Sequence, residues 1–117
     1  MNAISATVSR FAAMATSAAS TPSAPKTVKA VIKGRVQGVF YRDWTIENAR
    51  QIGINGWVRN RRDGSVEALF SGDPSSLSEM EQRCRRGPSD ALVTSVHVFP
   101  SDEQDVPPQG FYCKPTL

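Results

Sequence analysis

Residues 27–60 have the sequence TVKAVIKGRVQGVFYRDWTIENARQIGINGWVRN, which contains the first three elements of the predicted fold. It predicts a strand over Val28–Lys33 and a loop with two glycines over Gly34–Tyr41. Apolar spacing then predicts a helix over Arg42–Ile52, and a second strand follows over Asn55–Asn60. The first half of the domain is therefore a strand, a helix and another strand.

The remaining sequence predicts a hairpin, a second helix and two more strands. An Asp-Gly pair at residues 63–64 is typical of a hairpin turn. The later elements are expected at Ser65–Phe70 (strand), Pro74–Arg86 (helix), Ala91–Phe99 (strand) and Phe111–Cys113 (short strand). The order β-α-β-β-α-β predicts an α+β, ferredoxin-like split βαβ fold. Two helices would cover one face of an antiparallel sheet that carries a short extra C-terminal strand.

The chain has 117 residues and a formal net charge of +3, a length that suits one globular domain. Residues 1–26 are rich in Ala, Ser and Thr and carry Arg10 and Lys26 but no acid. Such a segment buries too little apolar area to fold, so we expect a disordered leader followed by a domain at 27–117. The leader resembles an organelle transit peptide, plastid or mitochondrial. The alternatives are an unprocessed extension of a cytoplasmic protein and a start at Met14.

Several classes of site are excluded by what the sequence lacks. No apolar run approaches the ~18–20 residues of a membrane-spanning helix, and no GxxxxGK[ST] motif exists to cradle a nucleotide. One histidine, His97, and two cysteines, Cys84 and Cys113, do not have the spacing of a metal site. The aromatic-rich strand of an RNA-binding module is also missing. We therefore expect no metal, no membrane and no nucleic acid.

The loop Gly34–Arg42 is the strongest candidate for a functional site. Its two glycines permit backbone conformations in which successive N–H groups turn inward and bind an anion at a helix N-terminus. Arg42 can present its planar guanidinium to two oxygens of one phosphoryl group. Charge favours the same region, because residues 27–62 hold eight basic and two acidic residues whereas 63–117 hold four and nine.

Two stretches match the motifs of one enzyme family. Gly34–Arg42, GRVQGVFYR, matches the pattern G-x-V-Q-G-V-x-[FY]-R, and Gly53–Asn60, GINGWVRN, matches G-[LIV]-x-G-W-V-x-N. On these motifs residues 27–115 resemble the acylphosphatase family. The resemblance implies an enzyme that hydrolyses the carboxyl–phosphate bond of a small-molecule acyl phosphate, without a metal, an organic cofactor or a covalent intermediate. A monomer is expected.

The resemblance also implies the roles of six residues. The phosphoryl group would be held by Arg42 and by the loop amides of Val36, Gln37, Gly38 and Val39. Asn60 would orient the attacking water. Such a sparse site is consistent with the chemistry, because an acyl phosphate has a good leaving group and phosphoryl transfer depends mainly on positioning and charge. We expect the fold to bring Asn60, at the end of its strand, beside the glycine loop.

Other interpretations of the function and of individual residues remain possible on the sequence. A non-catalytic ferredoxin-like module that binds an anion or regulates a partner has the same fold. Phe40, Tyr41 and Trp57 are interpreted as core or rim residues, one of which is a candidate for the border of the acyl group. Arg61 departs from the small hydroxyl residue that is frequent after the Asn in the family, and Pro115 departs from the basic residue that is frequent at the end of the last strand.

Overall fold

The computed structural model describes residues 24–117 of the chain. Its elements are β2 (Lys26–Arg35), α2 (Tyr41–Ile52), β3 (Asn55–Asn60), β4 (Val66–Gly72), α3 (Pro74–Arg86), β5 (Leu92–Pro100) and β6 (Phe111–Cys113). The predicted leader lies almost wholly outside the described residues. Because β2 begins at Lys26, the first residue of the folded part lies one position before the expected start at Thr27.

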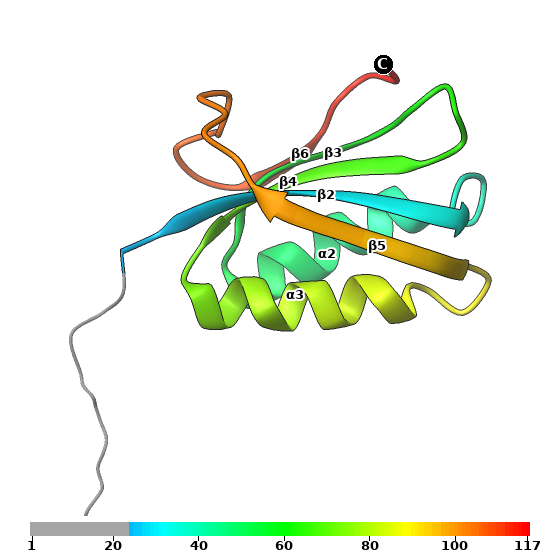
Figure 1. Ribbon diagram of the computed structural model, residues 1–117, viewed down its shortest axis with the longest axis horizontal. Coiled ribbons are helices and arrows are strands. Elements are labelled where there is room, and N and C mark those ends of the chain that lie inside the picture. Colours follow the sequence, from blue (N-terminus) through cyan, green and yellow to red (C-terminus); the bar gives the residue numbers. More distant parts are fainter. Residues whose placement is uncertain (1–23) are drawn as a thin grey trace, which may run out of the picture.

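The five strands form one sheet in the order β5-β2-β4-β3-β6. Helices α2 and α3 lie side by side on one face of it, as the predicted α+β, ferredoxin-like arrangement requires (Figure 1). Strands β5, β2, β4 and β3 pair with their neighbours in antiparallel orientation, whereas β6 pairs with β3 in parallel. The extra C-terminal strand therefore extends the sheet beside β3, and this parallel edge is a departure from a purely antiparallel sheet.

Local sequence explains where the helices begin and end. Gly53 adopts a left-handed conformation after α2, and its N–H bonds to the Ala49 carbonyl, which closes the helix. Pro74 stands at the first position of α3, where a missing N–H is tolerated. Asp73 is the N-cap residue of α3 in an extended conformation, and its side chain makes no capping hydrogen bond.

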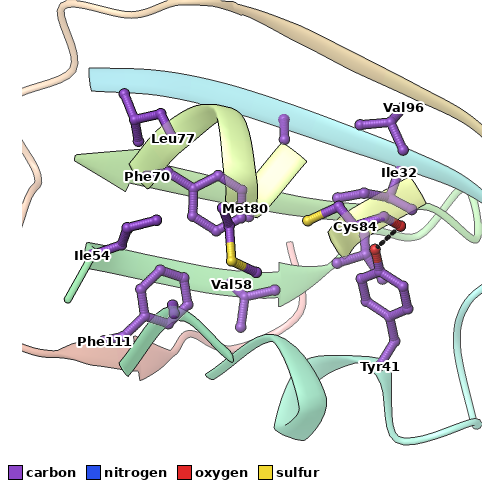
Figure 2. Close-up of a cluster of buried hydrophobic side chains, with 14 of the residues drawn as sticks. Ile32, Tyr41, Ile54, Val58, Phe70, Leu77, Met80, Cys84, Val96 and Phe111 are labelled. Carbon is purple, nitrogen blue, oxygen red and sulfur yellow. Dashed lines mark hydrogen bonds between the residues drawn. The ribbon is translucent and has the colours of Figure 1, made fainter. Parts of the chain in front are cut away.

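The core lies between the sheet and the two helices (Figure 2). Helix α3 contributes Leu77, Met80 and Cys84, whose i, i+3, i+7 spacing places them on one face of the helix. The phenol of Tyr41, at the start of α2, donates a hydrogen bond of 2.7 Å to the Cys84 carbonyl, which joins the two helices inside the core. This buried contact fixes the position at which α2 begins, and Arg42 is the next residue.

The β2–α2 connection and the β3–β4 turn lie at the same end of the sheet (Figure 1). Since β2 and β4 are antiparallel, the end of β2 pairs near the start of β4, and Ile32 is opposite Val66. Asn60 is also opposite Val66, on the other side of β4. The fold therefore carries the end of β3 to the loop that follows β2.

Candidate active site

Arg42 is held in place by the residues around the first turn of α2. Phe40 precedes the helix in a left-handed conformation, with φ 63° and ψ 24°, and its carbonyl accepts the first helical hydrogen bond from Trp44 N at 3.0 Å. Tyr41 is buried, with 1% of its surface exposed. Arg42 follows it, half-buried, at the positive end of the helix dipole.

The backbone of Asn60 is fixed from both sides. It pairs with Val66 in β4, and its carbonyl accepts a hydrogen bond of 3.1 Å from the N–H of Leu117. Pro115 does not disturb this edge, because the donors to β3 are Lys114 and Leu117 on either side of it. The departure at Pro115 thus leaves the main-chain support of Asn60 in place.

The side-chain oxygen of Asn60 has an unusual environment. Its Oδ1 is buried and accepts no hydrogen bond from residues 24–117. Buried polar atoms are nearly always hydrogen-bonded, and those that are not commonly mark a position for water or a ligand. The Asn60 carboxamide is therefore arranged to receive a small polar molecule.

Gln37 connects the glycine loop to the β3–β4 turn. Its Nε2 donates to the carbonyl oxygens of Arg61 and Ser65, at 2.7 and 2.8 Å. Both carbonyls belong to the turn that follows Asn60, and Arg61 N pairs with Ser65 O within the same turn. One side chain thereby fixes the distance between the loop and the end of β3.

The loop, the start of α2 and the end of β3 enclose a cavity of about 290 Å³. Its lining residues are Val36, Gly38, Phe40, Tyr41, Arg42, Asp43 and Asn60. The structure thus brings Arg42 and Asn60 together, as the sequence led us to expect, with Gly38 and Val36 beside them. Gln37 and Val39 lie outside the lining. Val39 packs against the core instead, and the Gln37 side chain contacts the turn.

Sequence reasoning missed two neighbours of the site. Asp43, an exposed residue in the first turn of α2, lines the cavity beside Arg42. The thiol of Cys113 in β6 lies 3.8 Å from Arg42 Nη1. The two residues are 71 positions apart, and a three-residue strand carries no signal for its partner, so the sequence offered no means of finding this contact.

The electrostatics of the cavity favour an anion. Arg42 forms no ion pair with any carboxylate in the described part of the chain, so its charge is available to a ligand. Tyr41 cannot act as a base at neutral pH, because burial, together with the nearby Cys84, raises the pKa of its phenol far above the ordinary value. The lining therefore offers a cation and a carboxamide, and Asp43 is its one carboxylate.

The sequence model of the acylphosphatase family matches residues 28–112, which is most of the chain. The protein belongs to the acylphosphatase family. Members of this family hydrolyse the carboxyl–phosphate bond of acyl phosphates, and the protein is an enzyme of that class.

Similar acylphosphatases occur in bacteria and among solved structures. An acylphosphatase of Rhizorhabdus wittichii is 50% identical over 86 residues, which cover 74% of this chain and 85% of that protein. One from Rhodospirillum rubrum is 49% identical over 92 residues, 79% of this chain and 99% of its own. The crystal structure of the Bacillus subtilis acylphosphatase matches with a TM-score of 0.70 and 29% identity, and covers 75% of this chain and 97% of that one. The acylphosphatase fold and the family motifs therefore agree.

Within residues 24–117 no helix is both long and apolar enough to cross a membrane. The same residues contain no group of three or more His, Cys, Asp or Glu side chains placed to hold a metal ion.

Proposed function

We propose that this acylphosphatase holds the phosphoryl group of its substrate with Arg42 and the backbone amides of Val36 to Val39, while Asn60 orients the attacking water. The observation that carries the proposal is the shared cavity. Arg42 from α2 and Asn60 from β3 line it together with Gly38, and the Asn60 Oδ1 atom is buried without a partner among residues 24–117.

The reaction needs only a positioned water and stabilised charge. The water oxygen attacks phosphorus, the bond between phosphorus and the acyl oxygen breaks, and the carboxylate leaves with the electron pair. A carboxylate is a good leaving group, so catalysis depends on alignment and on neutralising the equatorial phosphoryl oxygens. Arg42 and the loop amides supply this charge, and the proton of the water passes to a phosphoryl oxygen of the substrate.

A carboxamide suits the position of Asn60. It can accept a hydrogen bond from water through Oδ1 and remains neutral, so it does not repel a phosphate dianion. A carboxylate at the same place would bind water equally well but would face the substrate with a like charge. No base is required from the protein, which fits the neutral Tyr41 phenol at the cavity wall.

The test is hydrolysis of benzoyl phosphate in EDTA by the wild type, Arg42→Ala and Asn60→Ala, with Arg86→Ala on α3 as a surface control. Arg42→Ala should lower kcat/KM by about 10²–10³-fold and weaken inhibition by inorganic phosphate. Asn60→Ala should lower kcat by about 10²-fold and leave phosphate inhibition nearly unchanged. The wild type should keep full activity in EDTA, since the proposed mechanism uses no metal.

Each part of the proposal can fail separately. Undiminished turnover by Asn60→Ala would remove that residue from the mechanism. Loss of wild-type activity in EDTA would contradict a metal-independent reaction. A wild type that binds phosphate but does not hydrolyse benzoyl phosphate would indicate the alternative, a non-catalytic anion-binding module on the same fold.

We also propose that the segment before β2, predicted as residues 1–26, is a leader with an organelle address; the alternative is an unprocessed extension of a cytoplasmic protein. We propose separately that the folded part is a monomer. The leader proposal is supported by the Ala/Ser/Thr-rich sequence with Arg10 and no acid. Fusing residues 1–26 to a fluorescent reporter should direct it to plastids or mitochondria, and a cytoplasmic signal would contradict the proposal. Sedimentation of the folded part should give the mass of one chain.

A further inference from the structure

Phe40 combines two features that its local surroundings do not explain. It is the one non-glycine residue with a positive φ among residues 24–117, at φ 63°. Side chains with a Cβ avoid this region, where glycine or asparagine is common, and such strain clusters at functional sites. A glycine at this position would permit the same turn without strain, so the backbone alone does not favour a phenylalanine.

The ring of Phe40 gains nothing from the core. Phe40 is 76% exposed, the largest exposed fraction among the big apolar residues of the described chain, whereas the neighbouring Tyr41 is 1% exposed. Exposed aromatic surface contributes little to folding, because burial is the source of hydrophobic stabilisation. Neither the backbone conformation nor packing in the core favours a phenylalanine here. We therefore expect the Phe40 side chain to serve in binding a ligand, since it lines the cavity with Arg42 and Asn60.

The proposed mechanism places the acyl group on the side of Phe40. An in-line displacement puts the leaving group opposite the attacking water. Asn60 holds that water from the β3–β4 side, to which Gln37 ties the beginning of the loop. Phe40 comes from the other end of the loop, where the chain enters α2. The acyl substituent thus extends away from Asn60 and toward the Phe40 end.

We propose that Phe40 determines acyl specificity: its ring packs against the acyl substituent and favours aryl and other bulky apolar acyl phosphates over acetyl phosphate. The proposal rests on the function proposed above, because the direction of the acyl group follows from the placement of the water. It concerns the part of the substrate that the phosphate loop does not contact. Ring–ring contacts of this kind correspond to about three- to tenfold in an equilibrium constant.

The experiment compares benzoyl phosphate with acetyl phosphate in the wild type, Phe40→Asn and Phe40→Tyr. Asparagine tolerates positive φ, so Phe40→Asn removes the ring and keeps the loop conformation, and Phe40→Tyr keeps the ring. We expect Phe40→Asn to lower kcat/KM for benzoyl phosphate about three- to tenfold, through KM. Acetyl phosphate hydrolysis and phosphate inhibition should change less than about twofold, and Phe40→Tyr should resemble the wild type.

The control is Phe99→Thr, which removes another exposed aromatic ring from β5. Phe99 pairs with Lys29, near the end of β2 that lies away from the loop. Its loss should leave kcat/KM unchanged for both substrates. An equal loss on both substrates in Phe40→Asn would show a structural role and overturn the proposal. An unchanged ratio of kcat/KM for benzoyl phosphate to kcat/KM for acetyl phosphate in Phe40→Asn would overturn the proposal as well.

A second measurement separates this proposal from the catalytic one. Benzoylphosphonate and acetylphosphonate resemble the two substrates, but their acyl carbon is bonded directly to phosphorus, so the bond that the enzyme breaks is absent. Their dissociation constants therefore measure binding without turnover. Selective weakening of benzoylphosphonate in Phe40→Asn supports the contact even if the assigned catalytic roles fail. Equal dissociation constants for benzoylphosphonate in the wild type and Phe40→Asn refute the contact even if Arg42 and Asn60 are catalytic.

Discussion

At the scale of single residues, Gln37 has a part in the site that its position in the glycine loop does not reveal. Its side chain does not line the cavity but donates two hydrogen bonds to the turn that follows Asn60. Gln37→Met keeps the length of the side chain and removes both donors. The loop and Asn60, which we propose to orient the water, would then move relative to each other.

We expect Gln37→Met to lower kcat by about tenfold to a hundredfold, because small misplacements of reacting groups have effects of this size. Inhibition by inorganic phosphate should change less than about threefold, since Arg42 and the loop amides remain. Gln82→Met on the exposed face of α3 serves as the matched control. Equal losses in turnover and in phosphate inhibition would show that Gln37 shapes the phosphate loop itself and not its alignment with Asn60.

At the scale of secondary-structure elements, the approach of β3 to β4 depends on a glycine. Gly56 has φ 149°, and a Cβ at this position would lie 1.8 Å from the Leu69 carbonyl oxygen of β4. Gly56→Ala must therefore shift one backbone against the other, and we expect a loss of about 2–4 kcal/mol in the free energy of unfolding. Gly72→Ala, where the nearest atom is a side-chain carbon at 3.6 Å, should change stability by less than about 1 kcal/mol. Urea denaturation measures both, and equal stabilities would contradict the close approach.

The strands and helices differ in how well their sequences predicted them. β3 and β6 occur at the predicted residues. Asn55 and Asn60 mark the two ends of β3, and Gly110 comes directly before β6. Helix α2 begins one residue early, at Tyr41, since the buried Tyr41 contact with Cys84 extends the helix. The parallel pairing of β6 with β3 was not predicted, because a strand of three residues has no pattern that selects a partner.

The sequence also predicted some features of the candidate site and missed others. Arg42, Asn60 and Gly38 share a cavity as expected from the family motifs and the strand order. Such motifs identify residue types, but they do not specify side-chain directions. The bonds from Gln37, the exposed ring of Phe40 and the contact between Arg42 and Cys113 depend on packing between distant segments, so only the structure reveals them.

The face of the sheet opposite the helices carries a buried carboxylate on β4. Glu67 is 6% exposed; Arg59 Nε lies 2.8 Å from one of its oxygens and Lys29 Nζ 3.5 Å from the other. Burial raises the pKa of Glu67, but the hydrogen bond from Arg59 and the charges of both cations outweigh this effect and hold its pKa below the ordinary value. A carboxyl group whose pKa is lowered by folding stabilises the protein above its unfolded pKa, about 4.3. That contribution is lost as the pH falls through the folded pKa.

We therefore expect Glu67→Gln to lower the free energy of unfolding by about 1.5–3 kcal/mol at pH 7, the size of a hydrogen bond to a charged group. The difference from the wild type should shrink below about pH 4, because protonation removes the same charge in the wild type. Glu79→Gln, in an exposed pair with Arg83 on α3, should cost at most about 0.5 kcal/mol. Denaturant titrations at pH 7 and pH 3 test this, and a constant difference between the two pH values would contradict the assignment.

At the scale of the whole molecule, the fold mixes the two oppositely charged parts of the sequence. β2 and β3 belong to the basic part, and each pairs with β4 of the acidic part. Glu67 in β4 thereby forms ion pairs with Lys29 and Arg59, and Lys29 also pairs with Glu103 in the loop after β5. The charges of Arg42, Arg61 and Arg62, in contrast, meet no carboxylate of residues 24–117 within 4.0 Å. These guanidinium groups leave unpaired positive charge at the end of the sheet that holds the cavity, although Asp43 lines the cavity and Asp63 lies in the same turn as Arg61.

This residual positive charge should attract the anionic substrate in a salt-dependent way. Arg62 is exposed in the turn two residues after Asn60, and Lys26 is exposed at the opposite end of β2. At 10 mM salt the screening length is about 30 Å, so Arg62→Ser should lower kcat/KM about two- to threefold. At 0.5 M salt the screening length falls below about 10 Å and the two enzymes should converge. Lys26→Ser removes the same charge far from the cavity and should have little effect at either salt concentration. Equal effects of the two substitutions, or an Arg62→Ser defect that persists at high salt, would show that local contacts rather than the field of this end govern substrate capture.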